Sequence, residues 1–141
     1  MSTHILLIED SPTDAAILVA AFESIGYLGK IEVAKSGLEA INILGTIEAT
    51  SEQVWPRLIL LDLNLPRRSG LEVLDDIKTN PVWMSIPTVV LSSSSAPTDI
   101  INSYKRHANA YISKPRQLTH YEAVAKQLYS FWIETAQSPC C

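Results

Sequence analysis

The sequence predicts an α/β fold in which a parallel sheet of five strands is covered by helices on both faces. Short runs of branched aliphatic residues alternate five times with stretches of helical character along the 141 residues. Most of these runs are apolar on both sides, which is typical of strands buried between two helical layers. Such an alternation favours parallel strands joined by right-handed crossovers. We therefore expect one doubly wound domain over residues 1–141.

Five short apolar runs are expected to form the strands of this sheet. Each run has only a few residues and is rich in aliphatic side chains that pack well in a buried sheet. Turn and cap residues follow each run, so each expected strand has a defined end. The expected strands span residues 5–8, 31–34, 58–61, 88–91 and 110–112.

The first two connections between strands carry signals for the start of a helix. Ser11 offers an N-cap side chain, and Pro12 occupies the first helical position, where its missing N–H is not needed. Ser36 and Glu39 have the spacing of a capping box, which predicts the start of the second helix. The second helix is expected to run on into an irregular connection over residues 45–57.

The remaining three helices are predicted in the same way. Ser69 and Gly70 open the third helix, which must end before Pro81 because the residue before a proline disfavours helical backbone. Pro97 opens the fourth helix. The apolar spacing near the C-terminus predicts a fifth helix from about residue 117 to about residue 135.

Composition and charge argue against several classes of function. The net charge is −4, and no basic stripe is present that would attract nucleic acid. The N-terminus lacks the features of a signal peptide, and no run approaches the roughly 18 apolar residues of a membrane span. Cys140 and Cys141 are adjacent, so we assign them to a frayed tail over 136–141 beyond a core of about 4–135. We expect a cytoplasmic protein without nucleic-acid or membrane partners.

Chemically active side chains follow four of the expected strands. Glu9 and Asp10 follow the first strand, Asp62 the third, Ser92 the fourth and Lys114 the fifth. Ligands of parallel α/β sheets bind at the carboxyl ends of the strands, so one edge would collect all five side chains. Each alone is more often a turn, cap or surface residue. Three crowded carboxylates, however, need a cation. Their charge of −3 and the +1 of Lys114 leave −2, which one Mg²⁺ would balance.

Four motifs in this order and spacing resemble the receiver domains of response regulators, the CheY-like family. The motifs are Ile5-Leu6-Leu7-Ile8-Glu9-Asp10, then Leu60-Leu61-Asp62-Leu63-Asn64-Leu65-Pro66 with Gly70, then Pro87 through Ser92, and Tyr111-Ile112-Ser113-Lys114-Pro115. The resemblance covers residues 4–135 and implies a flavodoxin-like fold with strand order 2-1-3-4-5. The chain is also similar to the single-domain regulators of cyanobacterial phytochrome histidine kinases, through Ser103-Tyr104, residues 108–111 and Phe131-Trp132.

The resemblance implies that Asp62 is the phosphoacceptor of a two-component phosphorelay. Its carboxylate would attack a phosphohistidine or acetyl phosphate and form an acyl phosphate. Mg²⁺ would be held by Asp10, Asp62 and the backbone carbonyl of Asn64, with Glu9 acting through a water molecule. By this resemblance the chain is a signalling protein that catalyses only its own phosphorylation and dephosphorylation.

Lys114, Ser92 and Tyr111 complete the implied site. Lys114 would pair with a phosphoryl oxygen, and the resemblance favours a cis bond between Lys114 and Pro115. Ser92 would donate its hydroxyl to the phosphoryl group, and Tyr111 would then turn inward toward it; a half-buried aromatic side chain at a strand end is the alternative for Tyr111. Two positions depart from the commonest family pattern, since Ser92 replaces a threonine and Glu9 an aspartate.

The expected partners are proteins. A sensor histidine kinase or a phosphotransfer protein would supply the phosphoryl group, and by resemblance it would dock on the first helix around Leu18 and Phe22 and at Pro115-Arg116.

The last helix has an apolar arc of about 200°, wider than a one-sided surface helix needs. Its expected core stripe is Leu118, Tyr121, Ala125, Leu128 and Trp132, with Val124, Tyr129, Phe131 and Ile133 beside it. We expect a homodimer through the fourth helix, fifth strand and fifth helix. Alternatively, the C-terminal tail packs on the apolar surface of the last helix that the core does not bury.

Three other functions compete with phosphoryl transfer. A nucleotide or flavin binder shares the fold, but Glu9 and Asp10 would repel a bare phosphate. A phosphatase with an aspartate nucleophile normally carries a second aspartate two residues on, after the first strand, whereas Asp62 follows the third and is followed by Asn64. A receiver that binds partners without being phosphorylated is the third, although every side chain needed for phosphorylation is present.

Overall fold

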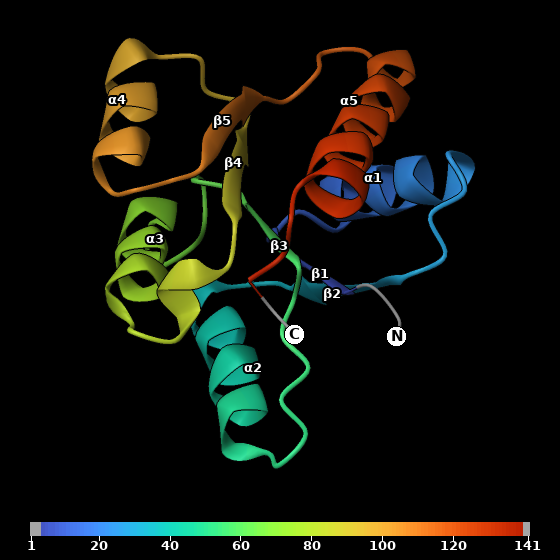
Figure 1. Cartoon of the computed structure of the whole chain (residues 1–141). Coiled ribbons are helices and arrows are strands. Elements are labelled where there is room, and N and C mark those ends of the chain that lie inside the picture. Colours follow the sequence, from blue (N-terminus) through green and yellow to red (C-terminus); the bar gives the residue numbers. More distant parts are fainter. Residues whose placement is uncertain (1–3, 140–141) are drawn as a thin grey trace.

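The computed structural model describes residues 4–139 and contains a five-stranded parallel sheet in the order β2-β1-β3-β4-β5 (Figure 1). The strands are β1 His4–Ile8, β2 Lys30–Ala34, β3 Leu58–Leu61, β4 Thr88–Ser92 and β5 Ala110–Ser113. The predicted fold class and strand order are confirmed, and each strand end lies within one residue of its predicted position. Cys140 and Cys141 lie outside the described residues.

Helices cover both faces of the sheet. They are α1 Pro12–Ser24, α2 Gly37–Ala49, α3 Gly70–Thr79, α4 Pro97–Lys105 and α5 Tyr121–Leu128, with the short turns η1 Trp83–Ser85 and η2 Leu118–His120 and the π-helical segment η3 Tyr129–Thr135. Helices α1 and α5 lie on one face, and α2, α3 and α4 lie on the other (Figure 1). In the described part of the chain, no helix is both long and apolar enough to cross a membrane.

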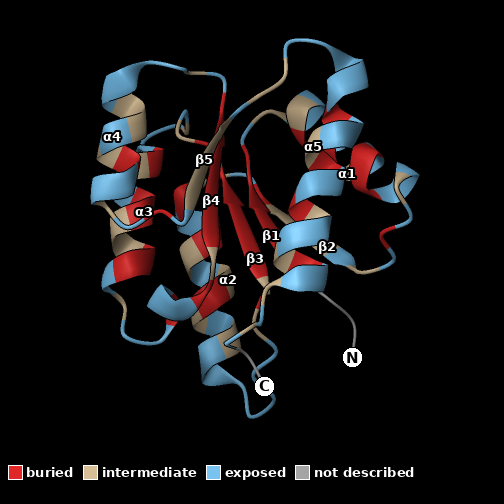
Figure 2. Ribbon diagram, turned by 45° about the horizontal axis from the view of Figure 1, so that its top comes forward, coloured by how far each residue is buried: buried red, intermediate tan, exposed pale blue. Residues whose placement is uncertain are grey.

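The central strands are buried on both sides, as their sequences predict. Successive residues of β1, β3 and β4 alternate between the two helical layers. Ile5, Leu60 and Val89 pack toward α1 and α5, whereas Leu6 and Ile59 pack toward α2 and α3. Figure 2 shows these strands as the buried centre of the molecule, with exposed residues on the outer sides of the helices. A sheet buried on both faces leaves its edges, where the strands end, as the places for a polar site.

The predicted helix starts are also found. The Ser11 side chain accepts a hydrogen bond from the Asp14 N–H at 3.2 Å, and Ser36 accepts one from Glu39. The reciprocal capping box expected at Ser36 instead occurs at Ser69, the N-cap of α3. These caps set where α1, α2 and α3 begin, directly after the loops that leave the carboxyl edge of the sheet.

The C-terminal helix differs from its prediction. Leu118, expected in the core stripe, is 68% exposed, because it belongs to the turn η2 before α5 begins. Beyond Leu128 the helix widens, and the Ala136 N–H donates to the Phe131 carbonyl five residues back. In this wider turn Ile133 is buried, whereas Trp132 packs against the core but is only partly buried, so full burial at the end of the expected stripe shifts by one position.

Candidate functional site

Three predicted carboxylates meet at the carboxyl edge of the sheet. Glu9 directly follows β1 and Asp62 directly follows β3, and both are buried, whereas Asp10 is exposed. Oxygen atoms of the three residues lie within 4.8 Å of one another. Oxygen ligands at this spacing suit a hard divalent cation. The predicted set of Glu9, Asp10 and Asp62 is therefore one that can hold such an ion.

Strand pairing positions the two buried acids. The ladder continues one residue beyond each strand, because the Glu9 N–H donates to the Ala34 carbonyl at 2.9 Å and the Asp62 N–H donates to the Ile8 carbonyl at 3.0 Å. Glu9 and Asp62 are thus held side by side by the register of β2, β1 and β3. The two acids are distant in sequence, yet backbone pairing alone places their Cα atoms on neighbouring strands, whatever their side-chain rotamers.

A close backbone contact shapes the loop after Asp62. The Gly70 N–H donates to the Leu63 carbonyl at 2.9 Å, and a Cβ atom at Gly70 would lie 2.5 Å from the Asp62 carbonyl oxygen. Only glycine fits there. The Asn64 N–H turns back and donates to Asp62 Oδ1 at 3.2 Å. Gly70, part of the motif read from the sequence, therefore holds the start of α3 against the predicted acceptor residue.

Lys114 brings a positive charge into the acidic group. Its ammonium nitrogen Nζ lies 2.5 Å from Glu9 Oε1, 2.9 Å from Asp14 Oδ2 and 3.2 Å from Asp62 Oδ2. The side chain is 8% exposed. An ammonium group has three N–H donors, and here each has its own carboxylate. The structure thus joins the predicted Lys114 to Glu9 and Asp62 across β1, β3 and β5.

Electrostatics differ between the members of this group. Burial raises the pKa of Glu9 to about 7; the hydrogen bond from Lys114 opposes this shift and Asp62 adds to it. Burial by itself would lower the pKa of Lys114, but its hydrogen bonds to Glu9 and Asp14 outweigh burial and raise the pKa above its usual range. The lysine therefore carries its charge throughout the physiological pH range, as a partner for anions must.

Asp14 is the site residue that the sequence did not predict. It lies in the first turn of α1, where an acidic residue is ordinarily explained by the helix dipole. Its position one short loop after Asp10 is the signal that could have identified it, because the first turn of α1 starts at the same sheet edge.

Ser92 and Tyr111 lie beside the acidic group on β4 and β5. Ser92 is buried, and its hydroxyl oxygen accepts a hydrogen bond from the Ser94 N–H at 3.3 Å. Tyr111 is half-buried, and its hydroxyl donates to the Ser94 carbonyl at 2.7 Å. Both side chains therefore contact the loop between β4 and α4. The inward turn of Tyr111 toward Ser92 stays a prediction.

Two hollows border the site. One of about 410 Å³ lies beside Asn64 and Ser92 and reaches Asp99 at the start of α4. The other, of about 480 Å³, is lined by Asp14, Lys114 and Arg116, among others. Reacting groups can therefore approach the carboxyl edge from the open side of the sheet.

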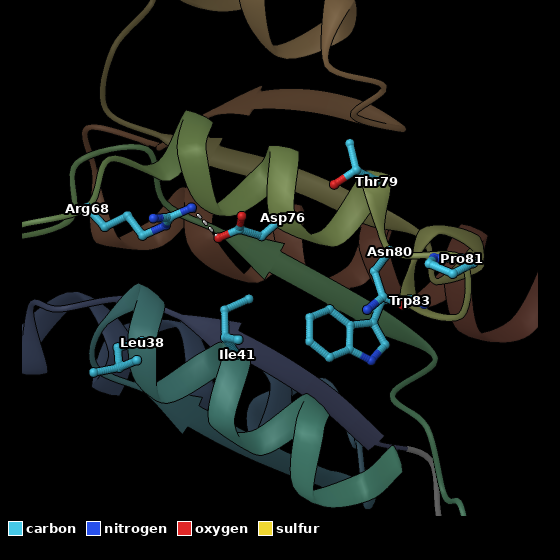
Figure 3. A pocket seen from close by; sticks show the side chains of 8 residues that line it. All are labelled: Leu38, Ile41, Arg68, Asp76, Thr79, Asn80, Pro81 and Trp83. Atoms are coloured by element: carbon cyan, nitrogen blue, oxygen red, sulfur yellow. Dashed lines mark hydrogen bonds and ion pairs between the residues drawn. The ribbon is translucent and has the colours of Figure 1, made fainter. Parts of the chain in front are cut away.

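A third hollow of about 550 Å³ lies between α2 and α3, lined by none of the predicted site residues. Figure 3 shows Arg68 and Asp76 paired at one end and Trp83 at the other, with Ile41 of α2 between them. The Arg68–Asp76 distance is 2.6 Å, so the charges in this hollow neutralise each other. It offers no unpaired charge that would select a ligand.

Two expectations drawn from the resemblance are wrong for this structure. The bond between Lys114 and Pro115 is trans, the form that the energetics of the peptide bond favour, and Lys114 reaches the carboxylates from it. Leu18 and Phe22, the residues around which a kinase was expected to dock, are buried in the core and cannot themselves contact it, while docking on other residues of α1 stays a prediction. Their i, i+4 spacing marks the inner face of the helix.

Known proteins resemble this chain over almost its whole length. The family described as response regulator receiver domain matches residues 5–126. Response regulator Rcp1 of Synechocystis sp. is 38% identical over 135 residues, covering 96% of this chain and 92% of that protein. The probable methanogenesis regulatory protein FilR2 of Methanothrix harundinacea is 35% identical over 135 residues, covering 96% of this chain and 86% of FilR2.

Two solved structures superpose closely on this one. The phosphorylated cyanobacterial phytochrome response regulator RcpA has a TM-score of 0.89 at 35% identity, with 99% of both chains covered. The Mn²⁺-bound form of Rcp1 has a TM-score of 0.86 at 37% identity, covering 97% of this chain and 99% of that one. Of these two similar proteins, one is phosphorylated and the other has bound a divalent cation.

Proposed function

The chain belongs to the response regulator receiver family, the signalling proteins of two-component systems, and from this membership we propose that it accepts a phosphoryl group on Asp62 in a Mg²⁺-dependent reaction. One observation carries the proposal. Asp62 directly follows the central strand β3, belongs to the oxygen cluster suited to a cation and accepts a hydrogen bond from Lys114. Glu9 and Asp10 lie on one side of it and Ser92 on the other.

The proposed reaction is a displacement at phosphorus. A carboxylate oxygen of Asp62 attacks the phosphorus atom of a phosphohistidine, an O–P bond forms, and the P–N bond breaks with its electron pair leaving on the imidazole nitrogen. The product is an acyl phosphate on Asp62. Lys114 then pairs with one phosphoryl oxygen and Ser92 donates its hydroxyl to another. Water attack on phosphorus later releases inorganic phosphate and restores the carboxylate.

The same acids would hold the cation. Asp10 and Asp62 are proposed as direct ligands, with the Asn64 carbonyl as a third oxygen and Glu9 acting through water. Bound Mg²⁺ would neutralise charge on the transferring oxygens. Around it, the chain's own residues hold Asp62 at the mouth of the site and keep Lys114 within hydrogen-bond distance of it. The cluster of three acids within 4.8 Å and the Mn²⁺-bound relative support this assignment.

Intact-mass spectrometry after incubation with acetyl phosphate tests the proposal. We expect one phosphoryl adduct on the wild-type chain with Mg²⁺, none with EDTA, and none on Asp62→Asn, which keeps the size of the side chain. Asp76→Asn is the matched control, because Asp76 is an acid on α3 whose partner is Arg68, outside the site. A wild-type chain that stays unmodified with acetyl phosphate and with a phosphorylated histidine kinase would contradict phosphorylation and leave a partner-binding receiver.

We propose that the phosphoryl donor is a sensor histidine kinase or a phosphotransfer protein. A phytochrome kinase is one such donor, on the strength of the similarity to RcpA, although FilR2 is similar as well. The donor would approach through the hollow beside Lys114, Pro115 and Arg116, which Ile17 of α1 also lines. Phosphotransfer from a purified phytochrome kinase to this chain, compared with a chain carrying Asp62→Asn, measures that partnership.

We further propose that the output surface is a homodimer contact through α4, β5 and α5. Four large apolar residues support it by their exposure. Two lie on α4, Ile101 at 51% and Tyr104 at 49%, and two lie on the segments that flank α5, Leu118 of η2 at 68% and Phe131 of η3 at 53%. Exposed apolar groups of this size favour association. Sedimentation of the wild-type chain against Tyr104→Ser and Phe131→Ser should separate a dimer from two monomeric variants. Three monomers would contradict the contact.

A further inference from the structure

The position of Asp14 suggests a role in the binding of the cation. We propose that Asp14 is a positioning residue that gives the Lys114 ammonium an anionic partner outside the cation site, so that a divalent ion and the lysine can share this pocket. The inference rests on the proposed function, because it requires a cation at Glu9, Asp10 and Asp62. Asp14 itself is not a member of that oxygen cluster.

The three partners of Lys114 are not equivalent. Glu9 and Asp62, with side chains 4% and 6% exposed, are buried and belong to the cation cluster. Asp14 is 37% exposed and lies on α1, and it lines the hollow on the side of Arg116 and Tyr121. The ammonium group therefore lies between two acids of the cation site, 2.5 Å from Glu9 and 3.2 Å from Asp62, and one acid outside that site, 2.9 Å from Asp14.

A bound divalent ion would weaken the attraction of Lys114 to the cation-site acids and leave its attraction to Asp14. Its two positive charges would act on Glu9 and Asp62 and would repel the ammonium of Lys114. The attraction between Lys114 and Asp14 would remain, because Asp14 is outside the cluster. Lys114 can then move toward Asp14 and keep an anionic partner. Without Asp14, its two remaining carboxylate partners are residues of the cation site, so lysine and metal ion compete directly.

Asp14 is well held for this role. The Ser11 side chain accepts a hydrogen bond from the Asp14 N–H at 3.2 Å, which fixes the first turn of α1 against the loop that carries Asp10. Ser11 in turn donates its own N–H to Glu9 Oε2 at 3.3 Å. The backbone thus keeps Asp14 at a set distance from the cation cluster, and only its side chain contacts Lys114.

A double-mutant cycle on metal binding tests the inference without any phosphorylation. The dissociation constant for Mn²⁺ is measured by electron paramagnetic resonance of the free ion, on the wild-type chain, Asp14→Asn, Lys114→Met and the double variant. We expect Asp14→Asn to weaken binding about tenfold when Lys114 is present and less than about twofold when it is absent, since contacting residues couple by such amounts.

Two further variants exclude simpler explanations. Glu23→Gln removes the same charge from an exposed position on α1 and should leave the Mn²⁺ constant unchanged. Asp14→Glu retains a carboxylate and should recover most of the lost affinity. If Asp14 serves only the first turn of α1, Asp14→Asn will lower the urea midpoint and will weaken Mn²⁺ binding equally in both backgrounds. Equal losses overturn the inference while the cation site stands; a wild-type chain that binds no Mn²⁺ overturns the cation site and the inference with it.

Discussion

Lys114 and Lys78 are both withdrawn from solvent, but they lie at opposite edges of the same sheet and among opposite kinds of partner. Lys114 follows β5 at the carboxyl edge and bonds to three carboxylates. Lys78, in the last turn of α3, lies at the amino edge. Its ammonium donates at 3.0 Å to the carbonyls of Met84 and Ile86 and to the side-chain oxygen of Asn109, all of them neutral.

The partners decide what each lysine can do. Burial lowers the pKa of Lys78 to about 8, whereas the carboxylates raise that of Lys114 against the effect of burial. A lysine among carboxylates can be exchanged for another cation or attract a phosphoryl group, because the negative charge stays behind. A lysine among neutral dipoles can only tie elements together, here α3 to the starts of β4 and β5. Buried charge is therefore a sign of function only where its partners are charged as well.

The largest expected effect is a pH dependence of stability carried by Lys78. The unfolded chain keeps the proton on this lysine up to its ordinary pKa of 10.5, whereas the folded chain releases it above about 8. Between these values the unfolded state holds more protons, so stability rises with pH, and below pH 8 the contribution is constant. Between pH 8 and pH 10.5 the free energy of unfolding should therefore increase by about 3 kcal/mol, at 1.36 kcal/mol per pH unit.

Urea unfolding at a series of pH values measures this difference. The free energy of unfolding of the wild-type chain, less that of Lys78→Met, should increase from pH 8 to pH 10.5. Subtracting the variant removes the titration of the other lysines and tyrosines. Lys114→Met serves as the control. Because the pKa of Lys114 is raised, this lysine stays protonated from pH 8 to pH 10.5, and the variant should show the same increase in unfolding free energy as the wild-type chain. Parallel curves for the wild type and Lys78→Met would show that Lys78 is charged equally in both states.

The second expected effect separates the two lysines by activity. Lys114→Met should slow phosphorylation by acetyl phosphate about a hundredfold, because it removes the positive charge facing the transferring oxygens. Lys78→Met should stay within about twofold of the wild type, since its ammonium contacts only the amino edge. Rates come from the time course of the mass adduct. Equal losses for both variants would mean that the effect passes through stability.

The same contrast explains what the sequence predicted. The strand runs and their ends were predicted correctly, and so was the placement of Glu9, Asp10, Asp62 and Lys114 at one edge, because parallel strands end there together. The functional roles of these residues stay predictions. Asp14 and Lys78 were not predicted. An acid in a first turn and a lysine in a last turn are both ordinary helix-end residues. Only tertiary packing shows that Asp14 bonds to the buried Lys114 and that Lys78 bonds to the carbonyl of the buried Ile86.

A smaller effect is expected at Asn109, the side chain that Lys78 shares with β4. Its side-chain oxygen accepts hydrogen bonds from the Thr88 N–H at 2.8 Å and from Lys78. Asn109→Ala leaves a donor of the buried Thr88 unpaired, which costs about 1 to 2 kcal/mol of unfolding free energy. Asn109→Asp is the informative companion. It supplies Lys78 with a charged partner, so it should remove the alkaline rise in stability by raising the pKa of Lys78.

The smallest effect is expected at the ion pair between Arg106 and Asp75, which ties the end of α4 to α3 close to Lys78 in the fold. Arg106 Nε lies 3.1 Å from Asp75 Oδ2, but the side chains are 36% and 50% exposed. Water screens such a pair, so Asp75→Asn should change the free energy of unfolding by less than about 0.5 kcal/mol, and less still at high salt. Urea unfolding with and without sodium chloride measures this. A loss as large as that of Asn109→Ala would mean that the surface ion pair holds the end of α4 as strongly as the hydrogen bonds of Lys78 and Asn109 hold α3. The charge of a partner would then matter for stability even where the pair is exposed to water.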